Sequence, residues 1–97
     1  MLVALGRFDL RIPGCTSLKE KRHVVKTITG ALRQKFNVSV AEVDHHDLWQ
    51  RTTIGVSSVS REGYQLKRVM HEVERHLEHH PAIEVIDSEL SLHGPDD

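Results

Sequence analysis

The chain has 97 residues, of which 38% are hydrophobic and 4% aromatic, so it can build one small domain with an aliphatic core. Its single cysteine excludes an internal disulfide and is typical of a reducing cytoplasm. No stretch approaches the roughly 20 apolar residues of a membrane span, and the early charges do not fit a signal peptide. We therefore expect a cytoplasmic protein with no membrane partner.

The N-terminal part predicts a strand followed by a helix. Residues 2–12 alternate apolar and charged side chains, which indicates a strand with one buried face. Pro13-Gly14 ends this strand, and residues 17–20 have the S-x-x-E form of a capping box that starts a helix. The apolar residues of that helix recur at helical spacing and define a core stripe: Leu18, Val25, Ile28 and Leu32.

The middle of the chain predicts two strands joined by a polar turn. In residues 38–44 the apolar positions change parity between Val40 and Ala41, which indicates a bulge or burial on both faces. Residues 51–60 are rich in Thr, Ile and Val and predict the next strand. The turn between these strands carries the only tryptophan of the chain.

The C-terminal part predicts a second helix and a last strand. Ser60 is expected to be the N-cap of this helix, which Pro81 ends. Its core stripe consists of Leu66, Val69, Met70, Val73 and Leu77. The last strand is expected at residues 83–92, and residues 93–97 are expected to form a flexible tail.

The order β-α-β-β-α-β predicts a ferredoxin-like α+β fold with one domain in residues 1–92. In that fold two helices cover one face of a four-stranded antiparallel sheet. The other face is expected to be partly apolar, because Val3 and Leu5 point away from the buried side of their strand. An apolar open face favours a homodimer that forms through it.

Several motifs resemble the YlxP-like family of small bacterial proteins. They are SLKEKR (17–22), FNVSVAEVD (36–44), DLWQR (47–51), IGV (54–56) and VS (59–60). The resemblance implies a ferredoxin-like fold, a cytoplasmic location and no established activity. It also implies a ribosome- or RNA-linked role, since members are encoded beside translation-initiation and ribosome-maturation factors. It provides no catalytic residue to transfer. Family members tend to have Gln at the position of His46, and Cys15 falls in a variable segment.

Charge is distributed unevenly along the chain. Residues 1–35 carry eight Lys and Arg against two carboxylates, and residues 36–97 carry five against twelve. Four cations of the first helix fall within an arc of roughly 60° beside the apolar stripe. With a fifth, they are the predicted RNA or phosphate contacts: Lys19, Lys21, Arg22, Lys26 and Arg33. The alternatives are a solvated helix face, or charges that attract the other half of the chain or a second copy.

The polar turn and its flanks contain five candidate residues: His45, Asp47, Trp49, Gln50 and Arg51. A structural interpretation places Trp49 at an edge of the core and lets Gln50 and Arg51 fix the hairpin, with Arg51 paired to Asp44 or Asp47. A second interpretation makes the turn a recognition surface anchored by Trp49 and Arg51. A third assigns acid–base chemistry to His45 and Asp47, although no nucleophile accompanies them.

The second helix is rich in histidine without forming a metal motif. HEVERH at residues 71–76 differs from H-E-x-x-H because Arg75 occupies the second ligand position. We predict no metal, no cofactor and no catalytic residue, and we interpret Cys15 as an unreactive thiol. The sequence thus favours a non-enzymatic binding protein that associates with the ribosome or RNA. The alternatives are a homodimeric protein-binding or regulatory module without nucleic acid, and a small enzyme using the His45/Asp47 turn.

Overall fold

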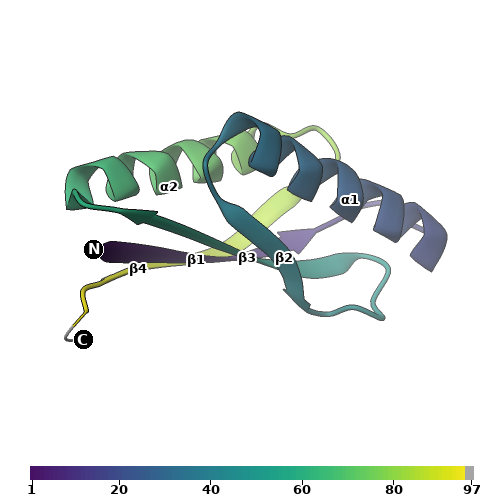
Figure 1. Cartoon of the computed structure of the whole chain (residues 1–97). Helices are drawn as coiled ribbons and strands as arrows, with labels where there is room; N and C mark the ends of the chain where they lie inside the picture. Colours follow the sequence, from purple (N-terminus) through teal and green to yellow (C-terminus); the bar gives the residue numbers. More distant parts are fainter. Residues whose placement is uncertain (96–97) are drawn as a thin grey trace.

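The computed structural model describes residues 1–95 and contains four strands and two helices in the predicted order. These are β1 (Leu2–Arg11), α1 (Leu18–Lys35), β2 (Ser39–Asp44), β3 (Arg51–Ser60), α2 (Gly63–Glu78) and β4 (Glu84–His93). All strand pairs are antiparallel, in the order β2-β3-β1-β4. Both helices lie on one face of this sheet (Figure 1), so the ferredoxin-like α+β fold is confirmed.

The core lies between the helices and the inward face of the sheet. Alternation along β1 turns Phe8 and Leu10 toward the helices, where both are fully buried. The helices cover them with the predicted stripes, whose fully buried members are Ile28, Leu32, Leu66, Met70, Val73 and Leu77. Packing of these stripes on one sheet face leaves the other face of the sheet without a helix (Figure 1).

The two helices begin differently. Ser17 caps α1 as predicted, since its hydroxyl accepts a hydrogen bond from the backbone N–H of Glu20 at 3.1 Å. The Glu20 carboxylate reaches back to the N–H of Thr16 at 3.0 Å. The prediction for Ser60 is wrong: α2 begins at Gly63 with Glu62 as its N-cap, because Ser60 still pairs with β1 as the last residue of β3.

Both edge strands contain a bulge. In β2 the register shifts between Glu42 and Asp44, so Val43 is the extra residue. The predicted irregularity therefore exists, but it lies beyond Val40 and Ala41, which pair regularly with β3. Glycine allows this arrangement, because a Cβ built on Gly55 would lie 2.9 Å from Val43 Cγ1. The bulge sets the direction in which the β2–β3 turn leaves the sheet.

The C-terminal end of the sheet extends further than predicted. His93 pairs with Val3 as the last residue of β4, so the expected tail at 93–97 begins inside a strand. Residues 96–97 of that tail lie outside the described residues. Neither of the helices in residues 1–95 combines the length and the hydropathy that a membrane crossing requires.

Candidate functional site

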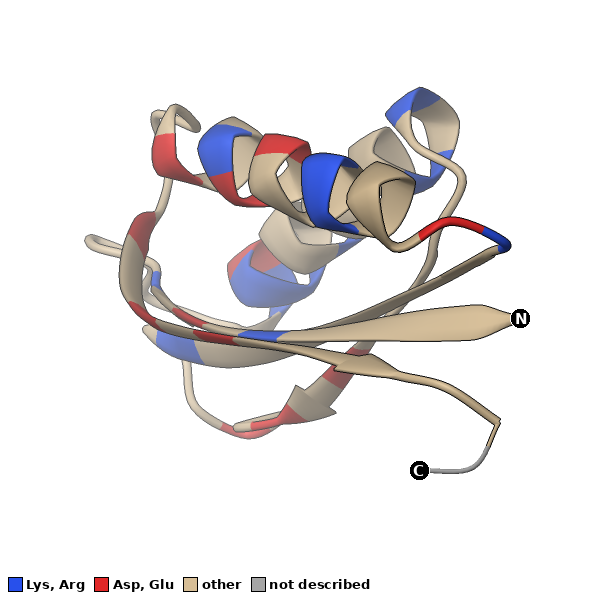
Figure 2. Cartoon of the chain, turned by 90° about the vertical axis from the view of Figure 1, so that its left-hand side faces the viewer, with Lys and Arg blue, Asp and Glu red and all other residues tan. Residues whose placement is uncertain are grey.

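The solvent face of α1 carries a row of unpaired cations. Lys19, Arg22 and Lys26 are exposed, and within residues 1–95 none of them forms an ion pair. Gly30 continues this row by one turn, and a Cβ placed there would meet no atom within 4 Å. In Figure 2 Asp and Glu recur along the sheet and α2, whereas Glu20 is the only carboxylate of α1. We call Lys19, Arg22, Lys26 and Gly30 the α1 row.

Arg33 and Lys35 extend the positive charge to the end of α1. Arg33 is exposed, but its Nη2 donates a hydrogen bond to the carbonyl oxygen of Val40 at 2.7 Å, which fixes the guanidinium beside β2. Lys35 Nζ lies 5.8 Å from the ring centroid of Phe36. Cations near a helix C-terminus also interact favourably with the helix dipole. These two residues therefore have structural partners that the α1 row lacks.

Lys21 is buried and does not belong to the α1 row. Its side chain is 1% exposed, and its Nζ lies 2.8 Å from Glu42 Oε2 and donates to the carbonyl oxygen of His45. The prediction that Lys21 contacts RNA phosphates is therefore wrong. At 100° per residue Lys21 falls between Ile28 and Leu32 around the helix, on its core side.

The carboxylate that pairs with Lys21 is held in its ionised form. Burial alone would raise the pKa of Glu42, but hydrogen bonds from Lys21 and Thr52 and the charges of Lys21 and His46 outweigh burial. The pKa of Glu42 is therefore below its ordinary value. Thr52 Oγ1 donates to the same oxygen, Glu42 Oε2, at 2.5 Å. The result is a satisfied ion pair between α1 and β2.

The β2–β3 turn is fastened at several points. His45 has a positive φ of 61°, and its carbonyl oxygen accepts the N–H of Leu48 at 3.2 Å. The carbonyl oxygen of Gln50 accepts the N–H of Ile12 at 2.9 Å, and Gln50 Nε2 donates to the carbonyl oxygen of Cys15 at 3.2 Å. These contacts agree with the structural interpretation of Gln50, which ties the turn to the loop between β1 and α1.

Two other turn residues belong to that interpretation. Trp49 is 50% exposed and is not among the hydrophobic residues that form or cover the core cluster, so its predicted place at a core edge stays a prediction. The predicted pairing of Arg51 with Asp44 or Asp47 is also absent from residues 1–95, and Arg51 Nε is buried without a hydrogen-bond partner. Arg51 instead lies beside Arg11 in the β1–β3 register. Trp49 is thus available at the surface of the turn.

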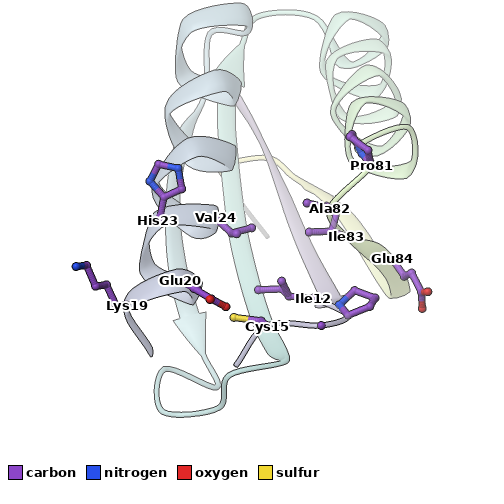
Figure 3. Close-up of a pocket in the computed structure, with 12 residues that line it drawn as sticks. Ile12, Cys15, Lys19, Glu20, His23, Val24, Pro81, Ala82, Ile83 and Glu84 are labelled. Atoms are coloured by element: carbon purple, nitrogen blue, oxygen red, sulfur yellow. The ribbon is translucent and has the colours of Figure 1, made fainter. Parts of the chain in front are cut away.

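A groove lies between the N-terminal half of α1 and the loop that joins α2 to β4 (Figure 3). It has a volume of about 600 Å³ and an apolar floor that includes Ile12, Val24 and Ile83. Cys15 is buried in its wall, and its Sγ donates to the carbonyl oxygen of Ser17 at 3.4 Å. Glu20 also lines the groove, but its carboxylate is engaged with Thr16. This groove therefore presents no converging set of polar groups.

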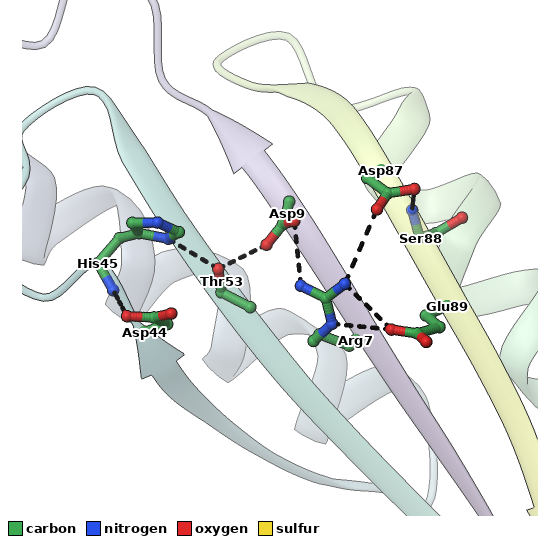
Figure 4. A network of polar contacts seen from close by, with 8 residues as sticks. All are labelled: Arg7, Asp9, Asp44, His45, Thr53, Asp87, Ser88 and Glu89. Carbon is green, nitrogen blue, oxygen red and sulfur yellow. Dashed lines mark hydrogen bonds and ion pairs between the residues drawn. The ribbon is translucent and has the colours of Figure 1, made fainter.

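A chain of polar contacts crosses the open face of the sheet (Figure 4). Thr53 Oγ1 donates to Asp9 Oδ1 at 2.6 Å and lies 2.9 Å from His45 Nδ1. Asp9 Oδ2 in turn lies 3.1 Å from Arg7 Nη1, and Arg7 also pairs with Glu89 at 3.0 Å. Hydrogen bonding from Thr53, followed by the charge of Arg7, outweighs burial and lowers the pKa of Asp9. The arrangement keeps Asp9 ionised.

This polar chain does not fit the predicted acid–base pair. A threonine hydroxyl has one proton, and Thr53 gives it to Asp9, so His45 Nδ1 is the donor toward Thr53. His45 therefore cannot activate Thr53 as a nucleophile by taking its proton. In residues 1–95 no hydrogen bond or ion pair joins His45 to Asp47. The two residues that accompany His45, Thr53 and Asp9, were not among the candidates from the sequence.

The histidine-rich end of α2 lies against the end of α1. His76 makes an edge-to-face contact with Phe36, with ring centroids 6.2 Å apart, and its Nε2 is buried without a hydrogen-bond partner. Burial, followed by the charges of Lys35 and His80, lowers the pKa of His76 below 6.5. Residues 1–95 contain no group of three His, Cys, Asp or Glu side chains placed to hold a metal ion.

Because the imidazole of His76 is buried, we expect the stability of the protein to depend on pH. Because its pKa is lower in the folded chain than in the unfolded chain, the folded state binds fewer protons in this range. The free energy of unfolding should then fall as pH is lowered through 6.5, and His76→Phe should reduce this fall. Urea unfolding of both proteins between pH 8 and about 5 checks it. His71→Phe, at an exposed position of the same helix, is the control. Equal slopes for wild type and His76→Phe would contradict the assignment.

Comparison with known proteins places the chain in a family. A family model described as "Protein of unknown function (DUF503)" matches residues 3–90. The chain belongs to the DUF503 family. A relative described as "Uncharacterized protein YlxP", from Bacillus subtilis (strain 168), is 41% identical over 83 residues, which is 86% of this chain and 90% of the relative. The predicted resemblance to YlxP-like proteins is confirmed.

The DUF503 match includes the α1 row, the buried Lys21–Glu42 pair and the whole β2–β3 turn, but it ends inside β4. Neither the family description nor the name of the relative states an activity. Function must therefore be argued from the surface of this chain. Within residues 1–95 the cations of the α1 row have no ion-pair partner, and the side chain of Trp49 is half exposed on the turn.

Proposed function

We propose that this DUF503 protein is a cytoplasmic, non-enzymatic module that binds RNA, in the context of the ribosome, through the α1 row. The observation that carries this proposal is the row of exposed cations without carboxylate partners. Arg7 and Arg11, the two cations of β1, are by contrast paired with Glu89 and Glu84. Unpaired cations keep their full charge for an external anion, and each phosphate that they neutralise would release counterions.

The geometry of α1 supports a polyanionic ligand over a single small anion. Lys19, Arg22 and Lys26 follow each other at intervals of three and four residues, so they lie along one side of the helix. With a rise of 1.5 Å per residue, the row from Lys19 to Gly30 extends for about 16 Å. Because Gly30 has no side chain and an open surrounding, a ligand can approach the helix backbone there. A row of this length matches several consecutive phosphates.

The sheet is a poor alternative platform for RNA. Its open face carries the carboxylates Asp9, Asp87 and Glu89, and β3 has no aromatic side chain on which a base could stack. Trp49 lies in the turn, away from the strands. RNA contact is therefore assigned to α1, with Trp49 as an exposed aromatic side chain on the adjoining turn.

Neutralising the α1 row tests the proposal. The triple variant Lys19→Gln, Arg22→Gln and Lys26→Gln should lose co-sedimentation with ribosomal particles at low salt. With purified RNA, the plot of log affinity against log salt should flatten by about 2–3 units of slope, because three phosphate contacts are lost. Folding should persist, because all three residues are exposed and unpaired.

A matched control exists on the other helix and its leading loop. Arg61, Lys67 and Arg75 are also exposed and unpaired in the described part of the chain, so changing them to Gln removes the same charge from a different face. The control triple should keep the salt slope of the wild type. Equal losses of RNA binding in both triple variants would show that the effect comes from net charge alone. Wild-type protein that fails to co-sediment even at low salt would refute RNA binding.

A protein-binding role through the open sheet face is the second candidate. Leu5, Val43 and Val59 are exposed there, at 46%, 53% and 56%. Leu5 and Val43 also line a hollow of about 270 Å³ between β1 and β2. The occupant would be another protein or, as the sequence predicts, a second copy. The double variant Leu5→Lys and Val59→Lys tests both, because it should abolish any association that uses this face while leaving RNA binding intact.

A further inference from the structure

The two edges of the sheet are built differently. The β2 edge is six residues long, contains the bulge at Val43 and has a charged residue, Glu42, on its inward side. Short length, bulges and inward charges are the devices by which proteins prevent edge strands from pairing. The β4 edge is ten residues long and, after its bulge at Ile86, pairs regularly with β1 up to His93. It contains neither proline nor lysine.

Apolar side chains accompany the backbone of β4. Leu90 and Leu92 lie on the helix side of the sheet, opposite Gly6 and Ala4, yet each is 38% exposed. They line a groove of about 250 Å³ between α2 and β4, together with Leu66 and Met70. An edge strand with unpaired backbone groups and exposed leucines beside them is a template for another strand.

We propose that a second copy of this chain pairs with β4 in antiparallel fashion, about a two-fold axis at Leu90. The sheets of both copies then form one continuous sheet, with the four helices on the same side. Leu90 faces Leu90 of the second copy, and Leu92 faces Ser88. On the open face Glu89 lies opposite Ser91, and Asp87 lies opposite His93, whose imidazole can donate a hydrogen bond to it.

Charge and length select this register. An axis at Ser88 would place Asp87 opposite Glu89, and an axis at Glu89 would place that carboxylate opposite itself, both of which are unfavourable. An axis at Ser91 would pair only residues 89–93 within the strands. The axis at Leu90 pairs residues 87–93 without opposing two carboxylates.

Each copy also neutralises the acidic part of its own edge. Arg7 lies 3.0 Å from Glu89 and 3.8 Å from Asp87, so β4 can approach its copy without two uncompensated rows of carboxylates. Because the pairing is isologous, it closes after two copies and covers both β4 edges. A different partner protein would leave the self-complementary register unexplained.

Cysteine cross-linking tests the register. In a Cys15→Ser background, Leu90→Cys should form an intermolecular disulfide on mild oxidation, because the two copies of residue 90 are directly opposite. Leu92→Cys alone should not, because two copies of residue 92 would be about 13 Å apart along the strands. The double variant Ser88→Cys and Leu92→Cys should cross-link again. A disulfide from Ser91→Cys but not from Leu90→Cys would overturn the register.

Sedimentation of the full chain tests the β4 interface without introducing cysteines. The wild type is expected to be a dimer at micromolar concentration, and Leu90→Lys a folded monomer. Leu5→Lys with Val59→Lys, on the open face, should remain a dimer. A wild type that stays monomeric at high micromolar concentration refutes the proposal. So does a dimer that survives Leu90→Lys and dissociates with the open-face pair. RNA binding by monomeric Leu90→Lys would be unaffected, because α1 is the helix that lies farther from β4.

Discussion

Replacing Lys21 with methionine is expected to lower the free energy of unfolding by about 3–5 kcal/mol. Methionine fills much of the same space, so the loss comes from electrostatics. The Glu42 carboxylate keeps its hydrogen bond from Thr52 and a contact with His46 Nε2 at 4.0 Å but loses its lysine, and the carbonyl oxygen of His45 loses a charged donor. Removing one member of a buried ion pair leaves the other charge in a poorly solvated place. In a domain of this size such a loss corresponds to a fall in Tm of at least 12 °C, at about 4–8 °C per kcal/mol.

Urea unfolding followed by circular dichroism measures this effect. Lys19→Met is the matched control, because it makes the same substitution two residues earlier at an exposed position and should change stability by less than about 0.5 kcal/mol. Adding Glu42→Gln to Lys21→Met should recover part of the loss, since the unpaired charge is then gone. A cost below about 1 kcal/mol for Lys21→Met would show that Glu42 finds water in the variant.

The fold was readable from the sequence because its main determinants are periodic. Alternation along β1 and the stripe of α2 each place apolar residues on one side of an element, and the residues on that side are the ones that are buried. The Ser17 cap was also predictable, because its signal is local and needs no knowledge of the tertiary structure. Local and periodic signals thus gave the elements and their order.

The candidate site was less predictable, because residue type and tertiary position conflict there. Lys21 looks like part of a cationic helix face, but it lies seven positions before Ile28 on the core stripe. Glu42 lies two positions after Val40, on the same inward side of β2. Those two spacings are the signal that could have identified the buried pair. The contact of Thr53 with Asp9 needed the β1–β3 register, and that of His45 needed the bulge at Val43, which no local pattern located.

Replacing Gly6 with alanine is expected to destabilise the protein by about 1–3 kcal/mol, although alanine is ordinarily better than glycine inside a strand. A Cβ at this position would lie 2.8 Å from Phe8 Cε2 and 3.2 Å from Leu90 Cδ2. Leu90 is partly exposed and can move aside, but Phe8 is fully buried among core residues of both helices. The strain therefore falls on the ring of Phe8, which close packing prevents from moving freely.

Gly30→Ala provides the control with the opposite sign. Its Cβ would meet no atom within 4 Å, and alanine favours a helix interior over glycine by about 1 kcal/mol, so this variant should be more stable than the wild type. Thermal unfolding of both variants gives the comparison directly. If Gly6→Ala were as stable as the wild type, the ring of Phe8 would have room that the structure does not show. Because the same substitution also displaces Leu90, Gly6→Ala should weaken the β4 dimer as well, and Gly30→Ala should not. Comparison of the two alanine variants thus separates the effect of crowding beneath the β4 edge from the general effect of adding a methyl group.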